Sequence, residues 1–267
     1  MKVLVASSEG VPFSKTGGLA DVAGALPKWL KKAGVDTCLV LPKYKMTDEK
    51  KFALEDTGEV LKIPVGEKII EAKIYKSALN LDVNRGAKLD VYFIGNDYYF
   101  GRDGLYGTIE GDYPDNDERF IFFSKSVLEL CKLIEFKPDI LHAQDWQTGL
   151  INTYLKTLYR YDSYFSRTKS VFTIHNIAYQ GVFPKEVIYK AGISWGEFLP
   201  DKLEYYGKVS FLKAGLVYSD IINTVSPTYA RQIQTTKEFG RGMEGVLSFR
   251  KNILFGICLL YTSPSPR

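Results

Sequence analysis

The chain has 267 residues, of which 45% are hydrophobic and 25% charged, so its composition is that of a globular protein. Its formal net charge of +4 is small and its charges are mixed along the sequence, which argues against nucleic acid and an acidic membrane as partners. No apolar stretch approaches the length of a membrane span, and the N-terminal residues are unlike a signal peptide. We therefore expect a cytoplasmic protein.

The cysteines and histidines are few and scattered. Cys38, Cys131 and Cys258 lie far apart, and the first two sit inside apolar runs, which indicates a reducing compartment. Only two histidines are present, His142 and His175, and neither CxxC nor HExxH spacing occurs. We therefore expect no metal site.

A glycine-containing loop follows the first predicted strand, over residues 2–7. Apolar residues recur at helical spacing directly after this loop, at Leu19, Val22, Ala23, Leu26 and Leu30. Gly17 and Gly18 allow a ligand close to the backbone, the N–H groups at a helix start favour negative charge, and Lys15 adds a cation. This order predicts a phosphate site.

The alternative is a tight turn with a solvated lysine. The spacing matches neither G-x-x-x-x-G-K-[ST] nor G-x-G-x-x-G, which disfavours a kinase or a dehydrogenase.

Short apolar runs alternate with amphipathic helical segments along the chain. The runs cover residues 2–7, 37–41, 139–143, 169–174 and 220–225. This alternation predicts an α/β fold with a doubly wound, mostly parallel sheet. Two further strand-like runs, 68–79 and 88–95, have no helix between them and share the turn Asn84-Arg85-Gly86, so we expect an antiparallel hairpin inserted at the sheet edge.

The segment 98–107 is rich in aromatic residues and glycine and has no period. It is typical of a surface loop whose aromatics either pack on their own domain or offer faces to a sugar. The helix predicted near 115–135 opens with acidic residues and continues with one apolar stripe, so its role is structural.

Three predicted strand ends carry polar or charged groups. The first strand leads to Lys15, the second ends in His142-Ala143-Gln144-Asp145-Trp146, and the third in Thr173-Ile174-His175-Asn176. Ligands of open α/β sheets bind at the carboxyl ends of the strands, so the convergence of these groups predicts a functional site.

Six motifs, taken in order, resemble the amino-terminal domain of bacterial glycogen synthase and plant starch synthase. They are KTGGLADV at 15–22, HAQDWQTGL at 142–150, TIHNIAYQG at 173–181, SFLKAGLVYSD at 210–220, TVSPTYA at 224–230 and GMEGVL at 242–247. The resemblance extends to about residue 257.

The resemblance implies a retaining GT-B transferase that moves glucose from ADP-glucose to the non-reducing end of an α-1,4-glucan. Residues 1–257 would then be the Rossmann-like, acceptor-side half, and the carboxy-terminal nucleotide-binding domain would be absent. The fragment alone would have little or no activity. Residues 258–267 look like translated non-native sequence and are excluded from this interpretation.

The resemblance also implies roles for the charged residues of the motifs. Lys15 would contact the donor diphosphate, supported by the amides of Gly17 and Gly18. His175 would orient the transferring glucose, and Asp145 would bind sugar hydroxyls or hold the geometry of the site. Asp21 would orient Lys15 or bind the acceptor, with a simple first-turn carboxylate on a helix dipole as the alternative.

Further residues are expected to line the sugar pocket. These are Asn176, Tyr179 and Gln180, for which a structural loop is the alternative, and Tyr99. His142 is as compatible with a core histidine as with a site residue, and Trp146 favours packing.

ADP-glucose is expected as a co-substrate, and no cofactor is implied. Two other functions stay open. One is a non-catalytic glucan-binding module that uses Tyr98, Tyr99, Phe100 and Tyr106, and the other is a related GT-B transferase that uses a UDP-sugar.

Overall fold

The computed structural model describes residues 1–81 and 87–258. Its centre is a nine-stranded sheet in the order β14-β13-β9-β8-β1-β2-β5-β4-β3. The strands are β1 (Lys2–Ala6), β2 (Asp36–Pro42), β3 (Glu55–Val65), β4 (Lys68–Asn80), β5 (Lys88–Gly95), β8 (Ile140–Gln144), β9 (Lys169–Ile174), β13 (Ile221–Thr224) and β14 (Leu254–Gly256). Every pairing from β14 across to β5 is parallel, whereas β4 and β3 pair antiparallel. The predicted α/β class is confirmed.

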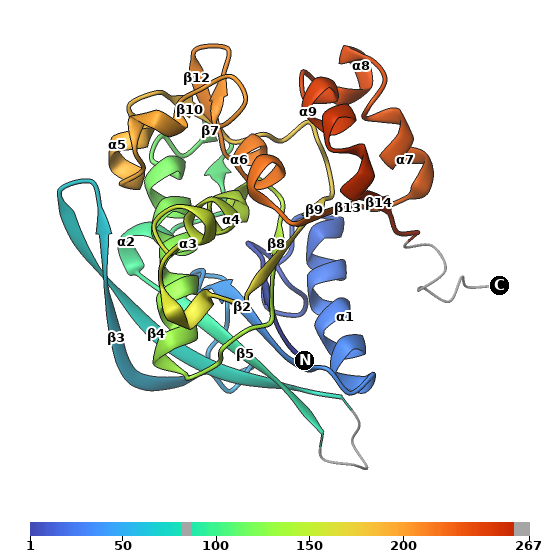
Figure 1. The fold of residues 1–267 in the computed structure, drawn as a ribbon. Coiled ribbons are helices and arrows are strands. Elements are labelled where there is room, and N and C mark those ends of the chain that lie inside the picture. Colours follow the sequence, from blue (N-terminus) through green and yellow to red (C-terminus); the bar gives the residue numbers. More distant parts are fainter. Residues whose placement is uncertain (82–86, 259–267) are drawn as a thin grey trace.

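Helices cover both faces of the sheet, as the doubly wound prediction requires. The longer ones are α1 (Gly18–Lys32), α3 (Asn116–Leu133), α4 (Gly149–Lys156) and α6 (Phe211–Tyr218). In Figure 1, α1 lies on one side of the sheet and α3, α4 and α6 on the other. The short helices are α2 (Asp97–Phe100), α5 (Val187–Ala191), α7 (Pro227–Gln232), α8 (Lys237–Gly240) and α9 (Glu244–Phe249).

Strand β1 shows why the sheet needs both layers. Successive side chains of a strand point to opposite faces. Leu4 and Ala6 accordingly join the larger apolar cluster, which includes α3, α4 and α6, while Val3 and Val5 join the smaller cluster with Phe13. The side chains of Val3, Leu4, Val5 and Ala6 are 3% exposed or less, so β1 is a central strand that fixes where the following loop begins.

The predicted hairpin is confirmed as β4 and β5, and its proposed turn at residues 84–86 lies outside the described residues. Strand β3 was not predicted, and it forms one of the two edges of the sheet. Its first residues are exposed and polar, and its register shifts between Asp56 and Val60, so neither alternation nor an apolar run marks it. Edge strands of this kind give little sequence signal.

The aromatic segment 98–107 is more ordered than the loop expected from its sequence. Asp97–Phe100 forms the short helix α2. The guanidinium of Arg119 in α3 fixes the segment by donating to the carbonyls of Tyr99 and Leu105, at 2.8 and 2.9 Å. The predicted helix near 115–135 is confirmed as α3.

Small antiparallel sheets complete the fold. They are β10 (Val182–Pro184), β11 (Glu204–Tyr205) and β12 (Lys208–Ser210) in one, and β6 (Gly107–Thr108) and β7 (Gly111–Asp112) in the other. Within the described ranges, no helix is long and apolar enough to cross a membrane.

Candidate active site

The chain reverses its winding direction between β1 and β8. From β1 the connection through α1 leads to β2 on one side, whereas β8 and β9 lie on the other side. In open parallel sheets, ligands bind outside the carboxyl ends of the strands at such a switch point. The loop after β1, Asp145 after β8 and His175 after β9 are therefore brought to the same edge, as predicted from the three strand ends.

Lys15 lies in the β1–α1 loop and is paired with Asp21 in the first turn of α1. Its Nζ is 2.7 and 2.8 Å from the two carboxylate oxygens of Asp21. Both side chains are about half exposed, 51% and 55%. Since an exposed pair of this kind adds little stability, its main effect is to direct the lysine.

Glu9 shapes the same loop from beneath and was missed at the level of sequence. Its carboxylate is 3% exposed and accepts hydrogen bonds from the N–H and the hydroxyl of Thr16, and from the N–H of Gly17 at 3.3 Å. The hydroxyl of Tyr106 also donates to it, at 2.6 Å. The only signal available was an acid directly after a buried strand and before a glycine-containing loop.

Gly17 and Gly18 stand at the start of α1, where anion binding was predicted. Gly17 is the extended N-cap residue and Gly18 the first helical residue. A Cβ at either position would meet nothing within 4 Å, so the space beside them is open. In this structure the Gly17 N–H already donates to Glu9, which restricts its use by another acceptor.

Asp145 follows β8 in a backbone conformation that side chains rarely adopt, with φ of 56° and ψ of −178°. Such a conformation costs about 1–3 kcal/mol. The carboxylate is 7% exposed and accepts the backbone N–H of His175 at 2.7 Å, across the β8–β9 boundary. Burial raises the pKa of Asp145 to about 7, although hydrogen bonds from the N–H groups of His175 and Asn176 act in the opposite direction.

The His175 ring is held by the side chain of Gln144, with 2.7 Å between His175 Nε2 and Gln144 Oε1. Burial lowers the pKa of His175 to about 4, so the ring is neutral at pH 7. Asp145 therefore holds the backbone of His175 while Gln144 holds its ring.

The three candidate residues after His175 differ in their exposure and in the hydrogen bonds that their side chains already form. Asn176 is exposed, and its Oδ1 accepts the Ala178 N–H at 3.0 Å. Tyr179 is 65% exposed. The amide nitrogen of Gln180 donates to the carbonyls of Ile177 and Arg241, at 3.2 and 3.0 Å, so Gln180 ties this loop to the α8–α9 region.

The aromatic side chains expected at a sugar surface are mostly in the core. Tyr99 and Phe100 are 1% and 0% exposed, and the Tyr99 hydroxyl lies 3.2 Å from Glu118. This burial contradicts the expectation that Tyr99 contacts substrate, because its ring has no face open to a sugar. Tyr106 bonds to Glu9, and only Tyr98 is largely exposed, at 69%.

Trp146 packs edge-on against Phe120, with ring centroids 4.9 Å apart. This contact agrees with the expectation that Trp146 serves in packing. His142 lies on the sheet face, where its Nε2 is 2.6 Å from the Thr173 hydroxyl, and that hydroxyl donates to Asn223 Oδ1 at 2.7 Å. Burial lowers the pKa of His142 to about 4.

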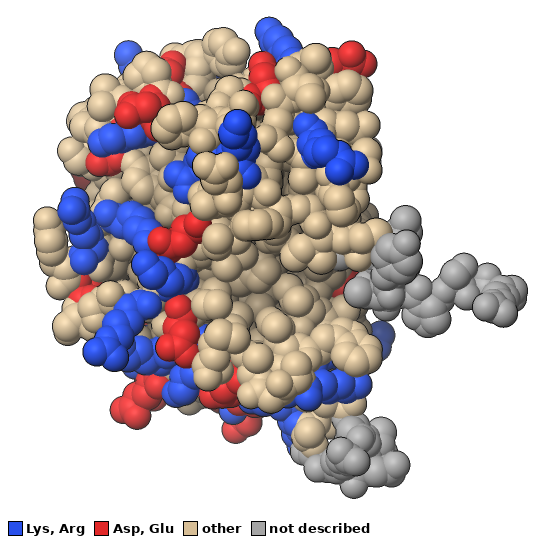
Figure 2. All heavy atoms as spheres, turned by 45° about the vertical axis from the view of Figure 1, so that its right-hand side comes forward, with Lys and Arg blue, Asp and Glu red and all other residues tan. Residues whose placement is uncertain are grey.

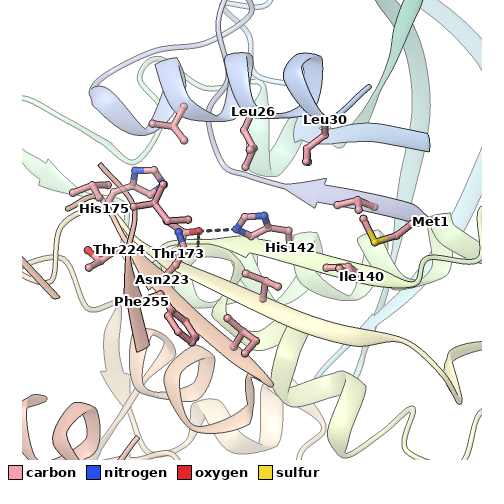
Figure 3. A pocket seen from close by; sticks show the side chains of 16 residues that line it. Met1, Leu26, Leu30, Ile140, His142, Thr173, His175, Asn223, Thr224 and Phe255 are labelled. Atoms are coloured by element: carbon pink, nitrogen blue, oxygen red, sulfur yellow. Dashed lines mark hydrogen bonds between the residues drawn. The ribbon is translucent and has the colours of Figure 1, made fainter. Parts of the chain in front are cut away.

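A groove of about 360 Å³ lies between α1 and the sheet face of β8, β9 and β13. Figure 3 shows Leu26 and Leu30 on one side of it, the His142–Thr173–Asn223 ladder on another, and His175 at one end. Its lining is mainly apolar and includes neither Lys15 nor Asp21. The groove therefore adjoins the polar site without being suited to a diphosphate.

Figure 2 shows basic and acidic side chains mixed over this side of the molecule, around a central area with neither.

Over the part of the chain that the structure describes, no group of three or more His, Cys, Asp or Glu side chains is arranged to hold a metal ion.

Comparison with known proteins agrees with the motifs. Residues 2–249 match the family model of the starch synthase catalytic domain. The chain belongs to this family. It is 46% identical over 258 residues to the glycogen synthase of Elusimicrobium minutum and 47% identical over 261 residues to that of Thermotoga maritima. These matches cover 96% of this chain and 52% and 51% of the two relatives.

A solved structure shares the fold. The catalytic domain of Starch Synthase IV from Arabidopsis thaliana, described as bound to ADP and acarbose, superposes with a TM-score of 0.85 at 30% identity. The match covers 96% of this chain and 51% of the other. The predicted family and the Rossmann-like fold are confirmed, and the chain spans about half the length of the curated relatives it matches.

Proposed function

We propose that this chain is the amino-terminal half of a retaining GT-B glycogen synthase that transfers glucose from ADP-glucose to the non-reducing end of an α-1,4-glucan. The observation that carries the proposal is the convergence of Lys15, Asp145 and His175 at the switch point of the sheet. The relatives named glycogen synthase support the activity, and the neighbour bound to ADP and acarbose supports a nucleotide and a sugar-like ligand.

Lys15 would stabilise the leaving diphosphate. Departure of ADP builds negative charge, and a cation held in place beforehand stabilises that charge without reorganisation. Asp21 directs the lysine, and Glu9 holds the loop that carries it.

Asp145 and His175 would act at the sugar. A carboxylate accepts two hydroxyl hydrogen bonds, and a neutral imidazole offers one donor and one acceptor. Because Asp145 also holds the His175 backbone at 2.7 Å, the two residues would orient the transferring glucose as one unit. Asn176, Tyr179 and Gln180 would border the same pocket.

The second domain would complete the site in the whole enzyme, so this chain alone would have little or no transferase activity. We propose no cofactor besides the co-substrate ADP-glucose. A cytoplasmic location fits the free thiols of Cys38 and Cys131, which are buried in the core. Sequencing the gene beyond codon 257 would test the prediction that residues 258–267 are not native.

Binding of ADP to the chain tests the role of Lys15. We expect Lys15→Ala to weaken ADP binding about tenfold to a hundredfold, the size of a lost charge-assisted hydrogen bond, with the melting temperature unchanged. Isothermal titration calorimetry measures both variants. Lys45→Ala is the matched control, because Lys45 also forms an exposed pair, with Asp103, at 2.8 Å.

The alternatives give different results in the same titration. Binding of maltoheptaose without any ADP binding would favour the glucan module. Fusion to the second half of the Thermotoga maritima enzyme then tests transfer itself, with ADP-glucose and UDP-glucose as donors.

A further inference from the structure

Gln144 is the last residue of β8 and contacts His175 directly. Its side chain is fully buried, and its Oε1 lies 2.7 Å from His175 Nε2. In the parallel register, Gln144 is opposite Thr173, two residues before His175. The amide therefore reaches the ring from the neighbouring strand end, and its position is fixed by the sheet.

The hydrogen bond determines where the ring proton resides. An amide oxygen only accepts, so the His175 Nε2 must carry the proton that it donates. A neutral imidazole has one N–H, which leaves the lone pair on Nδ1. No described residue forms a hydrogen bond to that Nδ1. The opposite amide orientation would donate to Nε2 and move the ring proton to Nδ1, so Gln144 controls whether His175 offers an acceptor or a donor.

The amide is retained at a cost. Gln144 Nε2 is buried and has no partner among the described residues. An unpaired buried donor costs about 1–3 kcal/mol, and an apolar side chain of similar size would avoid that cost. The amide contributes the hydrogen bond between its Oε1 and the His175 ring, which an apolar side chain could not form.

We propose that Gln144 is a positioning residue that keeps His175 in the form protonated on Nε2, with the Nδ1 lone pair as the free acceptor for a ligand hydroxyl. The use of that acceptor at a sugar rests on the proposed function. The position of the ring proton does not rest on the proposed function, because it is a property of the chain without ligand.

Nitrogen-15 NMR of the histidine rings tests the proposal on the chain as it is. Only two histidines are present, and His142→Gln assigns their signals. In the unmodified chain at pH 7 we expect His175 to show a protonated Nε2 and a bare Nδ1. A protonated Nδ1 would overturn the proposal without any substitution at residue 144, so the result does not depend on whether a variant folds.

Two variants then test the role of Gln144. Gln144→Met removes the acceptor, so we expect the His175 ring to populate both tautomers. Gln144→Glu places a carboxylate at the ring, and we expect the pKa of His175 to rise by about 1–3, as an adjacent opposite charge produces. The tautomer of His142, whose Nε2 contacts the Thr173 hydroxyl, is the internal reference and should not change. An unchanged His175 tautomer in Gln144→Met would contradict the proposal, whereas absence of glucose transfer by the fusion to the second half of the Thermotoga maritima enzyme would contradict only the proposed function.

Discussion

Glu9 is buried and has no basic partner among the described residues. Its carboxylate instead accepts hydrogen bonds from the N–H and hydroxyl of Thr16, the N–H of Gly17 and the hydroxyl of Tyr106. Hydrogen bonds to a charged group are worth about 1.5–3 kcal/mol each. They compensate the burial of the charge and keep the Lys15 loop in one conformation. In the proposed function, Lys15 would therefore bind the diphosphate without the entropic cost of ordering its loop.

Replacing Glu9 tests this ordering. In Glu9→Met the side chain keeps a similar length but has no oxygen to accept from Thr16 or Gly17. We expect the amide protons of these two residues to exchange faster and ADP affinity to fall about tenfold, equivalent to 1.4 kcal/mol. Hydrogen-exchange NMR and calorimetry measure the two effects. Glu55→Met, at an exposed acid on the edge strand, is the control, and equal effects from both variants would refute the assignment.

At the scale of elements, helix α1 docks on the loop before it. The Val11 N–H donates to the Ala20 carbonyl at 3.0 Å, and Gly24 faces Val11 so closely that an added Cβ would lie 2.5 Å from both its Cγ2 and its carbonyl oxygen. The missing side chain at Gly24 thus permits the approach that places Glu9 and Lys15 beside the helix start.

We expect Gly24→Ala to destabilise the fold by about 1–3 kcal/mol, the usual cost of overpacking, although alanine favours helix by about 1 kcal/mol. Urea unfolding measures the change. Gly245→Ala in α9 is the matched control, because its Cβ would meet nothing within 4 Å, so it should be neutral or stabilising. A stabilised Gly24→Ala would show that Val11 moves freely and that this docking does not constrain the loop.

Elements with a strong period or a buried apolar run were predictable. Strands β1, β2, β8, β9 and β13 and helix α1 were identified from their residues, and α1 was found even though it contains Pro27. The short parallel strand β14 was not predicted. Strand β3 was missed because its stability comes from pairing with β4 and not from its own pattern. The burial of Tyr99 was also unpredictable, since it depends on Arg119 from a distant helix.

At the scale of the whole molecule, the order of the strands brings the site together from three separated segments. The placement of Lys15, Asp145 and His175 at one edge of the sheet was predictable because these residues follow strand ends or lie in recognisable motifs. Glu9 and Gln144 were not singled out, because what matters about each is a contact made across the sheet. A single sequence shows residue types, whereas these contacts exist only after the strands are paired.

The buried titratable groups of the site give the molecule an unusual dependence of stability on pH. The folded pKa values of His142 and His175 are about 4, below the 6.5 of an exposed histidine, so unfolding takes up two protons below pH 6.5. The pKa of Asp145 is about 7, above its usual 3.8, so unfolding releases one proton between pH 7 and 4. The histidines therefore lower stability on acidification, and Asp145 raises it.

An unfolded histidine is half protonated at pH 6.5 and almost fully protonated at pH 5, so the net proton uptake rises from well below one towards one over this range. We therefore expect the free energy of unfolding to fall by about 1 kcal/mol between pH 6.5 and 5. In Asp145→Asn the opposing contribution is removed and the fall should grow to about 3 kcal/mol. In His142→Gln one histidine is removed and the two remaining contributions should cancel. Urea unfolding at both pH values measures all three chains, and a fall in Asp145→Asn no larger than in the unmodified chain would show that Asp145 is ionised throughout this range.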